Sequence, residues 1–169
     1  YSAHCEEMFT LTALEKGEAF GGDDLIFTSD MTEEIKQAVA IENAQASCEV
    51  VQGDIATKIS GFLSDGLRLR QLFGNAASAM ADASSDLKCT AVIDFDVKRE
   101  TDMQEAVFDV LLKVTAKGVG ETVMKDSRML FAKRLADHMN GASTFTVTGE
   151  DAEYMVRIPV QRADKERQK

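Results

Sequence analysis

Apolar residues in the middle of the chain recur at the spacing of an α-helix. They stand three or four positions apart, which places them on one helical face: Leu69, Leu72, Phe73, Ala76 and Met80. Asp65 precedes this run and has the carboxylate that favours a helix N-cap. The pattern therefore predicts a long helix that begins after Asp65 and buries its apolar face in the core.

Strands are predicted where apolar and polar residues alternate, or where β-branched and aromatic residues gather. The longest pair is expected at residues 90–98 and 106–115, joined by an acidic turn near Glu100. Shorter strands are expected at residues 25–28, 48–52 and 58–63, and a closing hairpin at 143–147 and 154–160. Pro159, the sole proline, is expected at a sheet edge, where a missing amide is tolerated.

A second helix is expected before the strand at residues 48–52. Ser29 or Asp30 would cap it, and Glu33 and Glu34 give it a capping-box arrangement. It would run to about Ala46. Its buried stripe is predicted to contain Ile35, Ala38, Val39 and Ile41.

A third helix is expected at residues 127–140, with Gly141 as a left-handed cap at its end. Its buried residues would be Met129, Leu130, Leu135 and Met139. Together these elements predict an α/β fold. It would be a two-layer sandwich, in which a mixed, mostly antiparallel sheet is covered on one face by three helices.

An extra N-terminal helix is predicted at residues 2–16, and Gly17 would end it. Met8, Leu11 and Leu14 form one apolar stripe on this helix. Such a stripe must meet the domain core or another chain, because an uncovered one favours aggregation. We therefore expect these three residues to be an interface.

Composition and charge narrow the classes of partner. The 169 residues suffice for one domain with a buried core. Lys and Arg total 19 against 29 Asp and Glu, and the net charge of −10 disfavours nucleic acid and anionic membranes. No apolar stretch approaches the roughly 18 residues that span a bilayer. We expect no nucleic-acid partner and no direct membrane contact.

The three cysteines, Cys5, Cys48 and Cys89, are far apart in the sequence and lack the spacing of metal ligands. An odd number of cysteines without such spacing favours reduced thiols. The sequence therefore predicts a cytoplasmic protein without a metal site.

Residues 64–78, SDGLRLRQLFGNAAS, resemble the helix that enters the nucleotide site of histidine-kinase catalytic domains. In that family, an Asp-Pro-x-Arg-Leu-x-Gln start leads to two asparagines four residues apart. Asn75 fills the first position, but Ala79 stands at the second, which holds magnesium in the family. The family's Asp-x-Gly-x-Gly turn, whose aspartate accepts the adenine amino group, is here Ala116-Lys117-Gly118-Val119-Gly120.

Other stretches extend the resemblance from Leu11 to Val160. Residues 133–141 and 154–160 are similar to the family's last helix and closing hairpin, and residues 11–17 to the end of its dimerisation hairpin. The resemblance implies a Bergerat ATPase-like domain at residues 18–160. Residues 1–17 would be the end of a dimerisation-hairpin-like helix, and residues 161–169 a polar C-terminal tail.

Measured against this family, the chain lacks most of the chemistry that holds ATP. Loss of the adenine acceptor at Ala116 would cost about 2–4 kcal/mol of binding free energy. Asp126 stands in the family's second glycine box and would repel phosphate, and residues 121–125 are too few to form a lid. The resemblance thus implies no catalytic residue and no cofactor, with Asn75, Gly118 and Gly120 as vestigial nucleotide-binding positions.

These three residues also have plain structural interpretations. Gly118 and Gly120 fit a tight turn between a strand and a helix, and Asn75 fits a polar residue at a helix edge. His4 is a candidate phosphoacceptor only by its position near the hairpin-like segment. Its neighbours lack the family's usual pattern, which favours a solvated histidine.

Three hypotheses for the function remain. The first is a degenerate histidine-kinase-like domain that transmits or scaffolds a signal and binds little or no ATP. The second is a divergent ATP-dependent histidine kinase, the only hypothesis that requires ATP and magnesium. The third is a histidine phosphotransfer or adaptor protein. The expected partners are other domains of a sensor protein, a second copy in a homodimer, or the receiver domain of a response regulator.

Overall fold

The computed structural model describes residues 24–101 and 105–162. Within them, three α-helices lie on one face of a seven-stranded sheet. The helices are α2 (Thr28–Glu42), α3 (Gly66–Ala83) and α4 (Ser127–His138), and a short 3-10 helix, η1 (Glu121–Lys125), precedes α4. The strands are β1 (Asp24–Phe27), β2 (Ser47–Gln52), β3 (Gly61–Ser64), β4 (Lys88–Thr101), β5 (Glu105–Lys117), β6 (Ala142–Thr148) and β7 (Asp151–Arg162).

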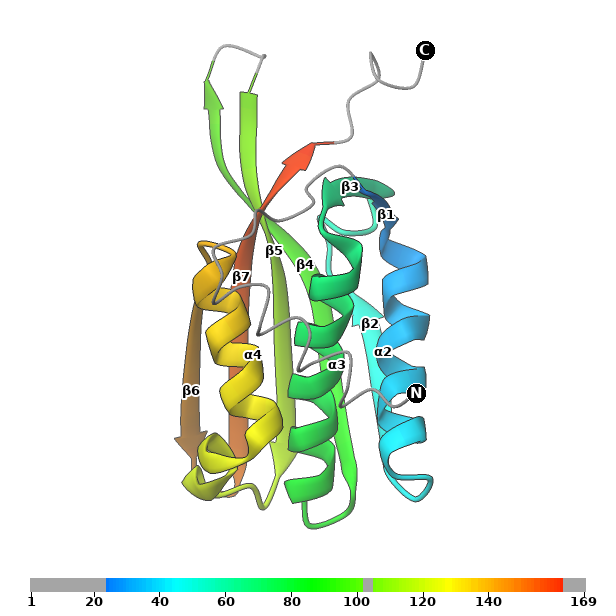
Figure 1. The fold of residues 1–169 in the computed structure, drawn as a ribbon, viewed down its shortest axis with the longest axis vertical. Helices are drawn as coiled ribbons and strands as arrows, with labels where there is room; N and C mark the ends of the chain where they lie inside the picture. Colours follow the sequence, from blue (N-terminus) through cyan, green and yellow to red (C-terminus); the bar gives the residue numbers. More distant parts are fainter. Residues whose placement is uncertain (1–23, 102–104, 163–169) are drawn as a thin grey trace.

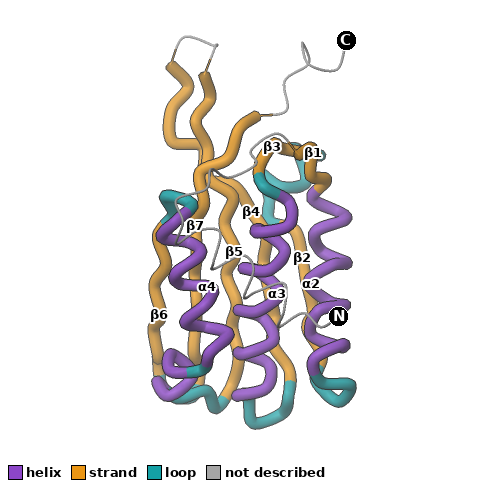
Figure 2. The backbone as a smooth tube through the Cα atoms, viewed as in Figure 1, coloured by secondary structure: helices purple, strands orange, loops and turns teal. Residues whose placement is uncertain are grey.

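The two layers are clear in Figure 2, where the helices stand in front of the strands. In Figure 1, α3 lies between α2 and α4, and it packs against both of them. The strand order is β1-β3-β7-β5-β4-β2, with β6 also paired to β7. Among the described strands, β2 and β4 pair in parallel and the other pairs are antiparallel. The predicted α/β sandwich with a mixed, mostly antiparallel sheet is confirmed.

The core lies between the helices and the sheet, as the helical spacing predicted. All five apolar residues assigned to the long helix are fully buried: Leu69, Leu72, Phe73, Ala76 and Met80. Phe95 on β4 makes edge-to-face contacts with Phe62 and Phe108, with ring centroids 5.4 and 5.5 Å apart. Burial of each such side chain stabilises the fold by about 1.5–3 kcal/mol. The Asp65 carboxylate accepts from the Arg68 amide at 3.2 Å, which confirms the predicted N-cap.

The start and end of α2 differ from the prediction. The helix begins at Thr28 with Phe27 as its N-cap, so neither Ser29 nor Asp30 caps it. The reason is that the Thr28 amide and hydroxyl donate to the carbonyls of Ser60 and Ile59, at 3.0 and 3.1 Å. These bonds fix the chain directly after β1, and helical geometry follows at once.

The helix α2 ends at Glu42 instead of about Ala46. Ile41 is 82% exposed and is not a core residue, whereas Met31 is buried with Ile35 and Val39. Met31, Ile35 and Val39 follow one another at four-residue steps on one helical face. Ile41 is two positions beyond Val39 and therefore lies on the opposite face.

The end of α4 also differs. Asn140, and not Gly141, adopts the left-handed conformation, with a φ of 61°. The Gly141 amide donates to the Ala136 carbonyl at 2.8 Å and the Asn140 amide to Asp137 at 3.2 Å, the pattern of a Schellman motif. Leu130, predicted as core, is 48% exposed. Phe131 is buried in its place.

Pro159 was predicted at a sheet edge, but it lies on β7, an interior strand. On one side, Pro159 is in register with Asp109 of β5. On the other side, the described pairing with β6 ends at Arg157 and that with β3 begins at Gln161. The proline is therefore tolerated at an interruption between two neighbouring strands, where an amide would have no strand partner.

Three of the predictions concern residues that the structure does not describe. The N-terminal helix at residues 2–16, with Met8, Leu11 and Leu14, lies outside the described residues. So do residues 102–104 of the β4–β5 turn and most of the polar tail. None of the helices in the described part of the chain is long and apolar enough to cross a membrane.

Candidate functional site

Asn75, the first of the three residues predicted to be vestigial nucleotide-binding positions, lies on α3 and is half-buried. Its side-chain amide donates to the Gln71 carbonyl one turn earlier, at 2.7 Å. This is an ordinary hydrogen bond of a polar residue within its own helix. The side chain of Asn75 is thus engaged locally.

Ala79 lies one turn beyond Asn75 and is fully buried. It has no side-chain oxygen, and magnesium binds through oxygen ligands in near-octahedral geometry. Within residues 24–101 and 105–162, no cluster of three or more His, Cys, Asp or Glu side chains is placed to hold a metal ion. The described residues around Ala79 therefore offer no metal-binding set.

Ala116, at the position of the adenine acceptor, is part of the core. It stands near the end of β5, in register with Cys89 of β4 and Ala152 of β7, and is buried. Its methyl group cannot accept a hydrogen bond from an amino group. A purine at this position would meet an apolar wall without an acceptor from residue 116.

Gly118 is required by the turn that follows β5. Its φ is +73°, and a Cβ at this position would lie 2.8 Å from the Cβ of Ser85. Its amide donates to the Glu150 carbonyl at 2.7 Å, and the Ser85 amide donates to the Lys117 carbonyl at 2.9 Å. The turn thereby joins the end of β5 to two other loops. Gly120 makes no such close approach, since the nearest atom to its ideal Cβ is 4.0 Å away.

The helix η1 occupies the segment in which the family's lid would lie. It contains five residues, and the buried side chain of Val123 anchors it to the core. The Asp126 amide donates to the Val123 carbonyl at 3.0 Å and leads directly into α4. The connection between Gly120 and α4 is therefore one short 3-10 turn with a single buried side chain.

The N-terminus of α4 is closed by its own side chains. The Asp126 carboxylate accepts from the Arg128 amide at 2.8 Å, and from Nε and Nη2 of the Arg128 guanidinium at 3.0 and 2.9 Å. Arg128 Nη1 also donates to Asp82 Oδ2, on α3, at 2.6 Å. The other Asp82 oxygen accepts from the Asn43 side chain, at the end of α2, at 3.0 Å. We call Asn43, Asp82, Asp126 and Arg128 the polar latch.

The polar latch sets the charge of this end of the sandwich. Hydrogen bonding to Arg128 lowers the pKa of Asp126, and the same bond raises the pKa of Arg128. Both side chains are therefore ionised at neutral pH. A helix N-terminus attracts phosphate through free amides and its positive dipole. At the N-terminus of α4, the Asp126 carboxylate already occupies the position that a phosphate would take.

Sequence reasoning identified Asp126 as unfavourable to phosphate but missed the rest of the polar latch. Arg128 and Asp82 are 46 positions apart, and no local pattern links them. The one available signal was that Arg128 stands two residues after Asp126, which directly precedes the helix expected at residues 127–140. That spacing suits a carboxylate–guanidinium pair, whereas the partners on α2 and α3 emerge only from helix packing.

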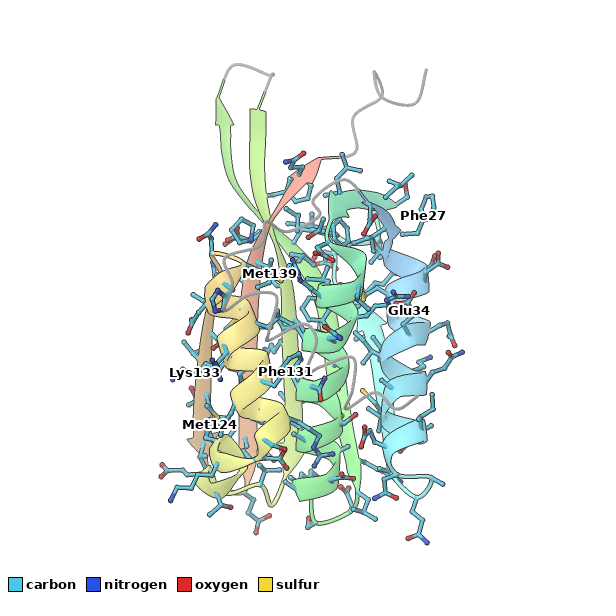
Figure 3. The ribbon with its side chains drawn as sticks, in the orientation of Figure 1. Phe27, Glu34, Met124, Phe131, Lys133 and Met139 are labelled. Atoms are coloured by element: carbon cyan, nitrogen blue, oxygen red, sulfur yellow. The ribbon has the colours of Figure 1, made fainter. Side chains whose placement is uncertain are left out.

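A pocket of about 350 Å³ lies at the other end of the sandwich, between β1 and the first turns of α2 and α3. Its wall combines exposed Leu25, Phe27 and Leu67 with charged groups. Glu34 Oε2 lies 3.5 Å from Arg70 Nε, and burial raises the pKa of Glu34. Figure 3 places Phe27 and Glu34 near this end, far from Met124 of η1. The pocket is thus separate from the polar latch.

No protein-family model and no curated protein matches this sequence. Solved structures do match. The histidine kinase AdeS of Acinetobacter baumannii has a TM-score of 0.65 and 13% identity, over 95% of this chain and 77% of that one. The mycobacterial sensor histidine kinase MprB has a TM-score of 0.56 and 9% identity, over 82% of this chain and 99% of that one.

Full-length ShkA, solved in complex with AMPPNP, has a TM-score of 0.55 and 19% identity over 87% of this chain. This chain covers 33% of the ShkA chain. Similarity at these identities is a similarity of fold. The chain therefore has a histidine-kinase-like ATPase fold, as the motifs from Leu11 to Val160 implied.

Proposed function

We propose that this chain is a degenerate histidine-kinase-like domain that serves as a signal-transduction or scaffold module and binds little or no ATP. The observation that carries the proposal is the Asp126 carboxylate at the N-terminus of α4. It accepts from the Arg128 amide at 2.8 Å, a group that a phosphate would otherwise bind. A triphosphate would have to displace this carboxylate against the repulsion of like charges.

Three further features support the same conclusion. The position of the magnesium ligand is Ala79, the position of the adenine acceptor is Ala116, and both are buried. The segment available for a lid is the five-residue 3-10 helix η1, which Val123 anchors in the core. The residues present do not fit ATP with magnesium, and we assign no catalytic step to them.

Thermal melting with and without nucleotide tests this proposal. A ligand at a hundred times its Kd stabilises a protein by about 2.7 kcal/mol, which is easily detected. We expect no magnesium-dependent rise in Tm with millimolar ATP or ADP. An active histidine-kinase catalytic domain in the same buffer is the positive control.

A matched variant makes the experiment sharper. Asp126→Asn removes the negative charge but keeps a cap acceptor. If Asp126 were the sole obstacle, this variant would gain nucleotide binding; we expect it not to, because Ala79 and Ala116 are unchanged. A clear magnesium-dependent Tm rise in the unmodified protein would overturn the proposal. It would favour a divergent kinase that uses Asn75, Gly118 and Gly120.

The proposed partners follow from the fold. MprB is a sensor histidine kinase by name, and this chain matches one third of full-length ShkA. We propose a cytoplasmic role beside other domains of a sensor protein, in a homodimer through Met8, Leu11 and Leu14, or with a response-regulator receiver domain. A phosphotransfer or adaptor protein would use the same receiver contact.

A further inference from the structure

Two cysteines that are distant in the sequence stand directly opposite each other in the sheet. Cys48 on β2 and Cys89 on β4 are register partners in the parallel β2–β4 pair. Because partners in a ladder direct their side chains to the same face, both thiols lie on the side covered by helices, and both are buried. The Cys89 thiol lies 3.6 Å from the Ala77 carbonyl of α3.

The backbone spacing suits a covalent link. Neighbouring strands lie about 4.8 Å apart, and the Cα atoms of disulfide-bonded cysteines are usually about 4.4–6.8 Å apart. Among the described strands, β2 pairs with β4 alone, at the end of the sheet order. An edge strand held by one neighbour opens more readily than an interior one and can adjust to the geometry of the bond.

We propose that Cys48 and Cys89 form a dithiol site that closes reversibly into a disulfide when a low-molecular-weight disulfide such as oxidised glutathione is present. The site shares no residue with the polar latch and does not depend on whether the chain binds nucleotide. If Cys48 and Cys89 are linked, Cys5 is the one remaining thiol in this sequence.

The two thiols have different roles, because they lie on different strands of the sheet. A hydrogen bond from Cys89 lowers the pKa of Cys48, with a smaller contribution in the same direction from Lys36. The same pairing raises the pKa of Cys89. Cys48 lies on the edge strand β2 and Cys89 on the interior strand β4, so an external disulfide reaches Cys48 first, and the Cys48 thiolate is the attacking group. Cys89 is the resolving group.

The exchange proceeds in two balanced steps. The Cys48 thiolate attacks one sulfur of oxidised glutathione and forms a mixed disulfide with it, while the glutathione S–S bond breaks and one glutathione leaves and takes up a proton. The Cys89 thiol then loses its proton, its sulfur attacks the Cys48 sulfur, and the second glutathione leaves. The protein loses two electrons and two protons, and oxidised glutathione takes them up to give two molecules of reduced glutathione.

The experiment uses the full chain with Cys5→Ser, so that the unpaired thiol cannot react. The folded protein is incubated in glutathione buffers of increasing oxidised fraction, quenched by alkylation, and analysed by intact mass and non-reducing peptide mapping. We expect a chain that takes up no alkyl group and is lighter than the unalkylated reduced chain by the mass of two hydrogen atoms, a peptide link between Cys48 and Cys89, and a higher Tm, because a cross-link constrains the unfolded chain. Dithiothreitol should reverse all three changes.

The matched controls are Cys5→Ser with Cys48→Ser and Cys5→Ser with Cys89→Ser, in which the mass loss and the Tm rise should both disappear. If either serine variant fails to fold, the peptide map of the Cys5→Ser chain alone still decides the link. A stable glutathione adduct in place of the intrachain bond, or a bond that forms only in denaturant, would overturn the proposal. Neither outcome depends on whether the chain binds ATP.

Discussion

Single residues decide what the end of α4 can bind. A helix N-terminus exposes amides that need acceptors, and any anion of suitable shape satisfies them. Asp126 supplies that acceptor from within the chain and is held by the Arg128 guanidinium. The Asp126 carboxylate thereby occupies the position in which an anion from solution would accept from the Arg128 amide.

Removal of this carboxylate should destabilise the fold. Asp126→Ala deletes the N-cap acceptor and leaves Arg128 without one partner, so we expect the free energy of unfolding to fall by about 1–3 kcal/mol. Urea denaturation measures the change. Ser127→Ala, at an exposed neighbouring position, is the control and should be nearly neutral. Equal stability of Asp126→Ala and the unmodified protein would refute the role of the cap.

The same group predicts a pH dependence. The pKa of Asp126 in the folded state lies below its ordinary value, because Arg128 stabilises the carboxylate. Its contribution to stability is therefore fully present above the unfolded pKa of about 3.9, and is lost as pH falls through the lower folded pKa. Urea midpoints of the unmodified protein and Asp126→Asn should differ by a constant amount near neutral pH and converge in acid. A difference that persists at the lowest pH would count against this coupling.

Two glycines with similar positive φ values allow the cost of backbone strain to be measured separately from the cost of steric crowding. Gly118 and Gly149 have φ values of +73° and +64°, but a Cβ would meet Ser85 at 2.8 Å only at Gly118. We expect Gly149→Ala to cost about 1 kcal/mol through strain alone, and Gly118→Ala to cost clearly more. Thermal or urea unfolding of the two variants gives the comparison. Equal costs would mean that the loop around Ser85 moves aside freely.

At the scale of elements, the polar latch ties the ends of three helices to one another. Asp82 belongs to α3, Arg128 to α4, and Asn43 follows α2. In a double-mutant cycle with Asp82→Asn and Arg128→Gln, we expect a coupling free energy of about 0.5–3 kcal/mol. Urea unfolding of the unmodified protein, the two single variants and the double variant gives this coupling free energy. Additive effects would show that α3 and α4 are held by apolar packing alone.

Elements were predictable from the sequence where their signal is local. The helix α3 has both a continuous apolar face and an N-cap at Asp65, and both were predicted. The start of α2 was not, because its first residue is fixed by the distant carbonyls of Ile59 and Ser60. The parallel pairing of β2 with β4 could not be predicted from the sequence either, since strand partners depend on the whole topology.

At the scale of the molecule, the sequence indicated the fold but only part of the site. The absence of nucleotide ligands at Ala79 and Ala116 is an expectation from motif positions alone. The polar latch could not be predicted in this way, because Asp82, Asn43 and Arg128 meet only after three helices have packed against the sheet. The pocket near Phe27 had no sequence signal either, since its wall comes from three separate elements.

The association of whole molecules gives a further prediction. Met8, Leu11 and Leu14 lie outside the described residues, and their role as an interface stays a prediction from their spacing. Replacing all three by polar residues should lower the light-scattering mass of the full chain at high concentration, because the apolar stripe would be lost. Leu130→Ser, at an exposed position of α4, is the control substitution. Monomers of equal stability before and after the triple change would exclude this interface.

The place of β7 in the sheet has a consequence for how the protein is made. This strand is the last described element in the chain, yet it pairs with β5, β6 and β3, and the register joins Arg162 to Phe62. Contacts between such distant residues form late and slow the folding of a chain. During synthesis, β3 and β5 must wait for β7 to leave the ribosome before the sheet can close. The growing chain therefore carries open strand edges until β7 appears, and in that period it is most exposed to aggregation and most dependent on chaperones.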